Sequence, residues 1–208
     1  MNQTGKGSLI GGGSGAVLGA VAGALIGNDA KSAAIGAAIG TAIGGGAGAL
    51  IGNKMDKKAE ELAALQGAQV ETVTDINGLE AIKVTFESGI LFPTNGTALN
   101  NNSKKALAEF ASQMKDLPET DITIYGHTDN TGSEAVNERI SNQRAAAVQT
   151  YLAQNGIDNQ RIKAEGKSFT MPVADNATAE GRAQNRRVEI YITANENMIK
   201  EAEAEARQ

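Results

Sequence analysis

The sequence has no cysteine, no tryptophan, only one histidine, and an aromatic content of 3%. Without cysteine, the 208-residue chain has no disulfide framework, no thiolate metal ligand and no cysteine nucleophile. The lone histidine, His127, excludes zinc sites built from several histidines and leaves little for histidine-based catalysis. We therefore expect no metal site, no cofactor and no enzymatic activity.

Positive charge is also in short supply, since the formal net charge is -5. A chain without a basic excess displaces few counterions from phosphates, which argues against a nucleic-acid partner. The polar start, residues 1–6, does not look like a cleavable signal peptide. The chain is either cytoplasmic or a mature form whose leader was removed, and composition leaves both open.

Glycine, by contrast, is concentrated at one end: sixteen of the 25 glycines lie in residues 1–53. Two uncharged runs, 8–28 and 32–53, flank a short polar hinge. In each run glycine recurs every four residues, at Gly11, Gly15, Gly19, Gly23 and Gly27 and then at Gly36, Gly40, Gly44, Gly48 and Gly52. The segment GAVAGALIGN nearly repeats as GGGAGALIGN, which indicates an internal duplication.

A spacing of four places the glycines of each run on one helix face. Each glycine costs about 1 kcal/mol relative to alanine in a helix, so the stripes need a compensating contact. Glycine has no Cβ, so two helices can approach closely along such a stripe, as they do in lipid. A helix of 21 residues is about 32 Å long, which is close to the thickness of the hydrocarbon core of a bilayer. The pattern predicts a glycine-zipper helical hairpin in residues 1–53, associated with membrane lipid. The alternative is a flexible spacer, and the pattern leaves open whether the hairpin spans the membrane.

The rest of the chain has the pattern of a globular α/β domain. We expect a linker helix in 54–68, a folded domain in 69–194 and an acidic, solvated or frayed helical tail in 195–208. Asn77-Gly78 is a strong hairpin signal, and RVEIYIT at 187–193 alternates cleanly as a strand. Strands separated by long helices predict a layered α/β sandwich. The expected strands are 70–74, 79–86, 121–125, 161–165 and 187–193, with helices at 100–115, 134–155 and 178–185.

The densest polar cluster is the loop GHTDNTG at 126–132, between a strand and a helix. Such a loop presents side chains and free amides together. Asp129 in the loop and Arg144 in the next helix suit a ligand with an ammonium and a carboxylate. Spacing alone slightly favours a plain salt bridge between them. Asn137 and Ile140 share the helix face of Arg144.

Two further groups in this region have expected roles other than catalysis or nucleic-acid binding. We expect His127 to hydrogen-bond a backbone carbonyl rather than to act in catalysis. The cluster Arg182, Arg186 and Arg187 is expected to brace a loop or to bind an anion, since nucleic acid is a poor partner for an acidic chain.

The stretch from GHTDNTGSEAVNERISNQRAAAVQTYLAQNGI to RIKAEGKSFTMPVADNATAEGRAQNRRVEI resembles the OmpA-like C-terminal domain family. That family includes the porin OmpA, the peptidoglycan-associated lipoprotein Pal and MotB-type stator proteins, and the resemblance covers about residues 70–193. A glycine-rich hairpin ahead of this domain further resembles the glycine-zipper OmpA-family lipoproteins of the YiaD type. The resemblance implies a βαβαβ-type sandwich that binds peptidoglycan without covalent chemistry.

The resemblance also assigns the site. It implies that Asp129 holds an ammonium of the diaminopimelate in the stem peptide, or orders the loop around it, and that Arg144 holds a carboxylate. Asn137, Ile140 and Thr128 would line the pocket, with Arg187 and Phe92 at its border. This chain has Pro93 where the family often has an acidic or other polar residue, so a ligand contact from position 93 is in doubt.

The expected function is a non-enzymatic tether between the outer membrane and peptidoglycan, at the periplasmic face of a Gram-negative envelope. On the same resemblance, the signal peptide and a lipidated cysteine are expected to have been removed ahead of Met1. The alternative is an assembly protein that forms homo-oligomers through its glycine zipper. A cell-wall hydrolase is a third option, for which the sequence offers no catalytic set.

Overall fold

A computed structural model describes residues 45–75, 77–93 and 96–208. Most of the expected glycine-zipper hairpin, residues 1–44, lies outside this described part. The helices and strands follow in the order α2 (Gly45–Leu62), β1 (Ala68–Thr74), β2 (Glu80–Glu87), α3 (Ser88–Leu91), α4 (Asn101–Gln113), β3 (Thr120–Gly126), α5 (Glu134–Gln154), β4 (Ile162–Gly166), α6 (Ala179–Asn185), β5 (Arg187–Ala194) and α7 (Glu196–Ala206). Two short 3-10 turns, Met114–Asp116 and Asn159–Arg161, precede β3 and β4.

The strands form one mixed sheet in the order β1-β2-β5-β3-β4. Strand β5 lies in the middle and pairs antiparallel with β2 and β3, while β3 and β4 run parallel. The first two strands form the expected hairpin, closed by Asp75, whose carboxylate accepts from the Asn77 and Leu79 amides, and by Gly78 at φ +76°. The α/β sandwich predicted from the sequence is confirmed.

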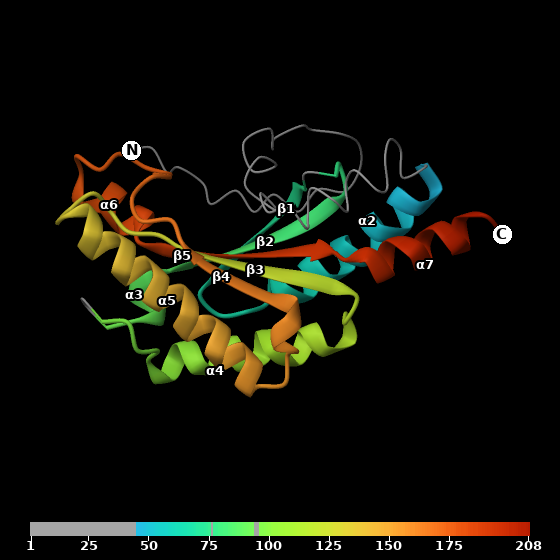
Figure 1. The fold of residues 1–208 in the computed structure, drawn as a ribbon, viewed down its shortest axis with the longest axis horizontal. Helices are drawn as coiled ribbons and strands as arrows, with labels where there is room; N and C mark the ends of the chain where they lie inside the picture. The colour runs from blue at the N-terminus through green and yellow to red at the C-terminus, as the bar shows by residue number, and fades with distance from the viewer. Residues whose placement is uncertain (1–44, 76, 94–95) are drawn as a thin grey trace, which may run out of the picture.

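The helices cover one face of this sheet. Alternate residues of the strands, such as Phe86 in β2 and Ile190 in β5, are fully buried against α2, α4, α5 and α7 in one apolar cluster. Figure 1 shows α4 and α5 side by side along this face. The intervening strand positions form a small second cluster of Val73, Ala81, Tyr125 and Tyr191 on the opposite face.

The expected linker helix differs from the structure. Helix α2 runs without a break from Gly45 to Leu62, so it crosses the boundary placed at residue 53 and ends before residue 68. Its apolar residues Ile51, Met55 and Leu62 are fully buried in the main core. The helix is therefore an integral part of the folded domain, because its apolar stripe packs against the sheet.

Two glycines of the predicted zipper, Gly48 and Gly52, lie within this helix, and Gly52 has a different neighbour from the one expected. Gly52 is buried, and a Cβ at this position would lie 2.7 Å from Oε2 of Glu80 in β2. Its bare Cα thus allows α2 to approach the sheet. Among the helices of the described residues, none is both long and apolar enough to cross a membrane.

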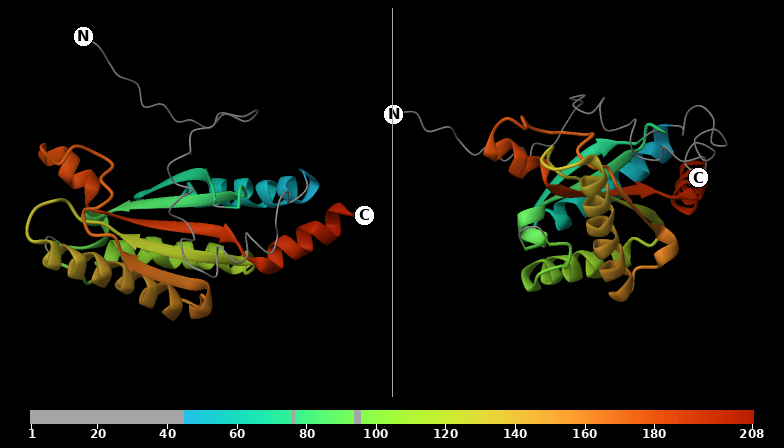
Figure 2. Two further views of the ribbon diagram at one scale, coloured as in Figure 1. Left: turned by 45° about the horizontal axis from the view of Figure 1, so that its top comes forward. Right: turned by 60° about the vertical axis from the view of Figure 1, so that its left-hand side comes forward.

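The C-terminal segment forms the helix expected for 195–208, but one side of it is buried rather than solvated. It forms α7, capped by Asn195, and buries Met198, Ile199 and Ala202. Helix α7 lies beside α2, where a Cβ on Gly46 would come within 3.1 Å of the Ala206 Cβ. Figures 1 and 2 place this helix pair at one end of the sheet and α6 at the other.

Candidate functional site

The candidate site is built where β3 passes through a short loop into α5. Strand β3 ends at Gly126, where an added Cβ would lie 2.2 Å from the Ser141 carbonyl oxygen. At the end of β4, a Cβ on Gly166 would lie 2.4 Å from the Asn142 amide. These two glycines let α5 lie close against the parallel strands, and Ser133 caps the helix start.

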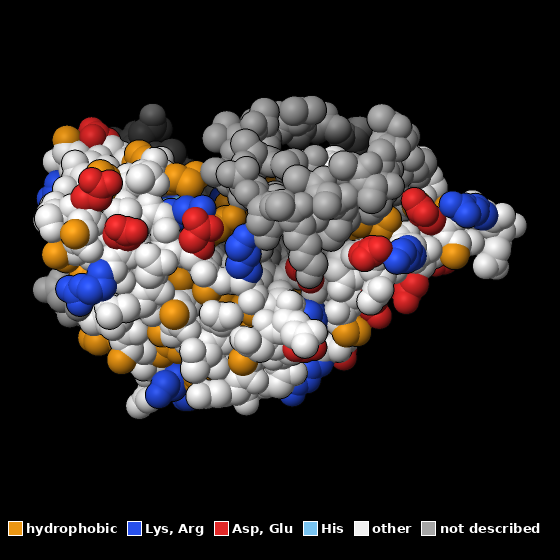
Figure 3. Space-filling view, in the orientation of Figure 1, with side chains coloured by type: hydrophobic (Ala, Val, Ile, Leu, Met, Phe, Trp, Pro, Cys, Tyr) orange, Lys and Arg blue, Asp and Glu red, His pale blue; other side chains and the backbone are white. Residues whose placement is uncertain are grey.

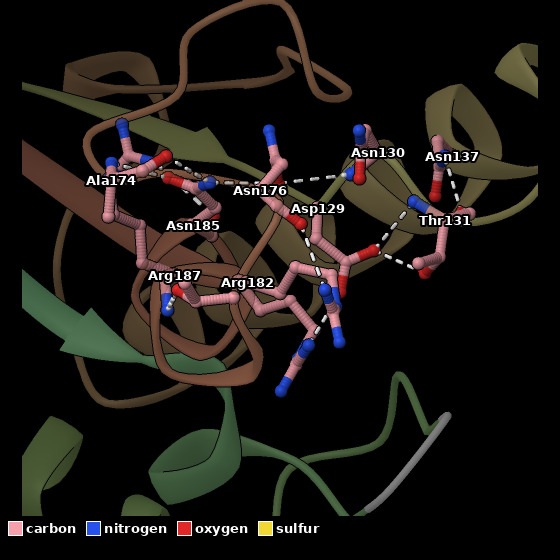
Figure 4. Close-up of polar contacts among 12 residues, drawn as sticks. Asp129, Asn130, Thr131, Asn137, Ala174, Asn176, Arg182, Asn185 and Arg187 are labelled. Carbon is pink, nitrogen blue, oxygen red and sulfur yellow. Dashed lines mark hydrogen bonds and ion pairs between the residues drawn. The ribbon is translucent and has the colours of Figure 1, made fainter.

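Asp129 is the buried carboxylate of this loop, with 5% of its surface exposed. Its Oδ1 accepts hydrogen bonds from the amide of Thr131, at 2.9 Å, and from the Thr131 hydroxyl. Its Oδ2 is paired with the guanidinium of Arg186. Figure 4 shows the carboxylate turned toward Thr131. Burial raises the pKa of Asp129, but the hydrogen bonds from Thr131 and Arg186 outweigh burial, so the pKa lies below its ordinary value and the group is charged at neutral pH.

Arg144 is the buried cation of the site, also 5% exposed. It projects from α5, its Nε donates to the Gly96 carbonyl at 3.1 Å, and its guanidinium lies 5.3 Å from the centre of the Phe92 ring. Within the described part of the chain, its two terminal nitrogens donate no hydrogen bond. Burial, followed by the charge of Arg186, lowers the pKa of Arg144, although Asp129 acts in the opposite direction. Its ordinary pKa is so high that it stays charged.

The plain ion pair between Asp129 and Arg144, slightly favoured by spacing, is not formed. The partner of Asp129 is Arg186, whose side chain is 42% exposed. Asp129 and Arg186 nevertheless both act on the pKa of Arg144, so the three charged groups share one region.

The other predicted site residues take different places. Asn137 is buried and donates from Nδ2 to the Thr131 carbonyl at 2.9 Å, which fixes the loop to α5. Ile140 is half-buried on α5. Thr128 is buried, and its amide donates to the Ser168 carbonyl at 2.8 Å. Its hydroxyl has no hydrogen-bond partner among the described residues.

Arg187 does not join this group, because its donors are used elsewhere. It is 4% exposed and bonds Glu189 at 2.8 Å, the Asn185 carbonyl at 3.2 Å and the Met171 carbonyl at 3.1 Å. The structure thus brings Asp129, Arg144, Asn137 and Phe92 together and leaves Arg187 as a brace for the neighbouring loop.

His127 lies at the other side of the same loop. It is 1% exposed, and its Nε2 is 3.2 Å from Oε2 of Glu189. Neither ring nitrogen forms a well-aligned hydrogen bond within the described residues, so the expected bond to a backbone carbonyl is wrong. Burial lowers the pKa of His127 from its ordinary value, although Glu189 acts in the opposite direction. Glu189 has a pKa of about 2: burial raises it, but the close approach of the His127 ring and the ion pair with Arg187 lower it more.

Two contributors to the site have no distinctive signal in the sequence. Arg186 is one of a cluster of three arginines, and Asn176 stands in a loop without a recognisable motif. Asn176 holds the loop before α6 against the site: its Oδ1 accepts from the Asn130 amide at 3.4 Å and from Asn185 at 2.9 Å, as Figure 4 shows. Figure 3 shows acidic and basic side chains interspersed on the face in view.

The fold and the site together define an α/β domain in which a buried carboxylate and a buried guanidinium lie close enough to interact electrostatically. Two family models match the chain: the OmpA family over residues 91–186 and the glycine zipper over residues 7–59. Residues 91–186 therefore form a domain of the OmpA family, as the resemblance implied, and a glycine-zipper segment precedes it.

Three curated proteins illustrate the relationship. Outer membrane protein A of Bordetella avium is 43% identical over 112 residues, which is 54% of this chain and 58% of that protein. Probable lipoprotein YiaD of Escherichia coli is 37% identical over 54% of this chain and 51% of its own. Peptidoglycan-binding protein ArfA of Mycobacterium tuberculosis is 41% identical over 54% of this chain and 34% of its own. The chain thus spans about half, or less, of the length of these relatives.

Two solved structures are similar as well. A MotB-like protein from Desulfovibrio vulgaris superposes with a TM-score of 0.61 over 71% of this chain and 99% of that chain; at 24% identity it shows the shared fold. The cell wall anchor of the T6SS from Pseudomonas aeruginosa has a TM-score of 0.57 and 30% identity, over 68% of this chain and 97% of that chain.

Proposed function

We propose that the chain is a non-enzymatic peptidoglycan-binding protein that ties the outer membrane to the cell wall by holding the diaminopimelate of the stem peptide. The observation that carries the proposal is the pair of buried, oppositely charged groups at one place, Asp129 and Arg144. The terminal nitrogens of Arg144 lack an acceptor among the described residues, so the guanidinium is ready to take a carboxylate.

Diaminopimelate in a stem peptide offers a free ammonium and a free carboxylate at one end. The carboxylate matches Arg144, which Gly96 and Phe92 hold in place before the ligand arrives. The ammonium matches Asp129, which is charged at neutral pH. No bond of the ligand is made or broken, so this is binding without catalysis.

A shallow groove of about 490 Å³ leaves room for the rest of the peptide. It lies between the segment before α4 and the surface of α5, and its lining includes Thr97, Leu99, Lys104, Gln143, Ala147 and Tyr151. Gln143 and Ala147 lie one residue and one turn from Arg144 on α5, so a chain attached to a ligand at Arg144 can enter the groove.

The relatives support the envelope assignment. Their printed names include an outer membrane protein, a probable lipoprotein and a peptidoglycan-binding protein, and a similar structure is that of a cell wall anchor. On this basis we place the domain at the periplasmic face of the outer membrane. The glycine zipper would contact membrane lipid, and a lipid anchor would precede Met1. Many membrane-confined copies on one polymer would add avidity.

The test is sedimentation with purified peptidoglycan. Asp129→Ala and Arg144→Ala should each weaken binding by about 10-fold to 150-fold, the equivalent of a charge-assisted bond of about 1.5–3 kcal/mol. Arg139→Ala is the matched control, because Arg139 is an exposed arginine on the same helix. Asp129→Asn, which keeps the shape of the side chain, should behave as Asp129→Ala. If all these variants sediment like the unmodified protein, the site assignment is wrong.

A second candidate function is assembly through the glycine zipper, favoured by the family match to residues 7–59. In that case the zipper forms homo-oligomers, and the OmpA-family domain only positions them. The Asp129 and Arg144 variants separate the two functions. If the protein is a scaffold, substitution of either residue leaves its oligomeric state and its role unchanged.

A further inference from the structure

The contact between Arg186 and Asp129 places a cation of the protein where the proposed ligand would place its ammonium. The Arg186 guanidinium lies 2.5 Å from Oδ2 of Asp129. Thr131 supplies two donors to Oδ1 of Asp129, whereas Oδ2 accepts from Arg186. A ligand ammonium that approaches Oδ2 therefore competes with Arg186 for this oxygen.

The side chain of Arg186 can move away from Asp129 without a change in the backbone around it. Its backbone is anchored, because its carbonyl accepts from the Ser88 amide at 2.8 Å and its amide donates to the Arg182 carbonyl at 3.1 Å. Its side chain, in contrast, is 42% exposed and has Asp129 as its single hydrogen-bond partner among the described residues. A fixed backbone with an exposed, singly bonded side chain permits the guanidinium to swing over a short distance.

The charges at the site also indicate where Arg186 would go. Arg144 and Arg186 bring two positive charges to a place with one carboxylate, that of Asp129, and these are the charged groups that act on Arg144. When a ligand ammonium takes over Asp129, both guanidiniums need an acceptor. Guanidinium groups bind carboxylates through paired donors, so one ligand carboxylate can serve both.

We propose that Arg186 is a specificity-determining residue that occupies Asp129 in the free protein and moves to the ligand carboxylate, beside Arg144, when the ligand binds. The inference rests on the proposed function and adds a selection rule to it. A stem peptide whose diaminopimelate end carries a free carboxylate compensates the displaced Arg186. A peptide amidated at that carboxyl displaces Arg186 and offers it no charged acceptor, so it binds more weakly.

The experiment uses the full chain and two synthetic peptides. Both are L-Ala-γ-D-Glu-meso-diaminopimelate. In one peptide the carboxyl on the carbon that carries the free ammonium is unmodified, and in the other this carboxyl is amidated. Their affinities are measured by calorimetry for the unmodified protein, Arg186→Gln, Arg186→Lys and the control Arg139→Gln. The unmodified protein and Arg139→Gln should prefer the free carboxylate by about tenfold or more, the equivalent of one charge-assisted hydrogen bond.

Arg186→Gln should reduce this preference at least about threefold, with the amidated peptide binding more tightly than it does to the unmodified protein, because Asp129 is no longer occupied. Arg186→Lys should give an intermediate preference, because a lysine keeps the charge but not the paired donors. An unchanged ratio in Arg186→Gln would overturn this inference while leaving the proposed function in place. If the unmodified protein binds neither peptide, both proposals fail, and Arg144 then has another ligand.

Discussion

At the scale of single residues, the site combines a carboxylate that already has a cationic partner with a guanidinium whose terminal nitrogens have no acceptor among the described residues. Asp129 accepts from Thr131 and Arg186, whereas Arg144 donates only from Nε, to the Gly96 carbonyl, in the described part of the chain. A buried charged group with unused donors is costly unless a partner arrives. Among the described residues the two halves of the site therefore differ: Arg186 already pairs with the carboxylate, and the terminal nitrogens of the Arg144 guanidinium have no partner.

The sequence singled out Asp129 and Arg144, which the structure places in one region, but it could not separate Arg186 from Arg187. Adjacent residues at a strand start point to opposite sides, so one arginine reaches Asp129 and the other reaches Glu189. Which one goes where depends on the position of β5 in the sheet, which is a tertiary fact. The resemblance placed Arg187 at the site border, and the structure gives Arg186 that position instead.

A titratable residue outside the site yields a pH prediction. Burial and the neighbouring Asp56 raise the pKa of Glu80 from its ordinary value of 4.5 to about 7. The folded state then holds this proton more tightly than the unfolded state, so the free energy of unfolding should fall as the pH rises from about 4.5 to about 7. Glu80→Gln should remove this fall and raise the free energy of unfolding at pH 8 by up to about 1 kcal/mol, since Glu80 is partly exposed and screened.

Urea unfolding of Glu80→Gln and the unmodified protein at pH 5 and pH 8 measures this effect. The control is Glu87→Gln, at the exposed other end of β2, which should leave the pH dependence as it is. Equal shifts in both variants would show that Asp56 and burial do not act specifically on Glu80.

At the scale of helices and strands, local signals were reliable where a turn or an alternation decides the structure. Asn77-Gly78 closes the β1–β2 hairpin, and the alternating segment 187–193 forms strand β5. The helices α4 and α5 begin and end within two residues of the expected bounds. These elements are specified by capping and periodicity, which a sequence displays directly.

The helices α2 and α7 were less predictable because each is stabilised by the other. Neither the glycine-rich start of α2 nor the acidic surface of α7 looks like part of a core. The apolar residues Met198, Ile199 and Ala202 become informative only once α2 lies beside them. Their packing turns an apparent tail into a structural element.

This pairing predicts a marked effect of a single core residue in α7. Met198 is fully buried, so Met198→Ala should lower the free energy of unfolding by about 2–4 kcal/mol through lost burial and a residual cavity. The control is Glu201→Ala, on the exposed side of the same helix, which should change it by less than about 0.5 kcal/mol. Chemical denaturation followed by circular dichroism measures both. A loss below about 1 kcal/mol for Met198→Ala would mean that α7 is not part of the cooperative unit.

At the scale of the whole molecule, the two ends of the domain differ in role. The α2–α7 pair, where the chain leaves toward the glycine-rich segment, lies at one end of the sheet, and α6 with its neighbouring site loops lies at the other (Figures 1 and 2). The OmpA-family match covers residues 91–186, so α2, β1, β2, β5 and α7 lie beyond it. In a tether, this arrangement would face the wall-binding site away from the membrane-proximal end.

The central claim is that the wall is held through the ammonium and the carboxylate of diaminopimelate. The most direct measurement is sedimentation of the full chain with purified diaminopimelate-containing peptidoglycan in the presence of free competitors. Free meso-diaminopimelate should release the protein in a concentration-dependent way, and 1,5-diaminopentane, which has the ammonium groups without carboxylates, should not. Retention of the protein on the wall at saturating diaminopimelate, or equal release by the diamine, would contradict the account.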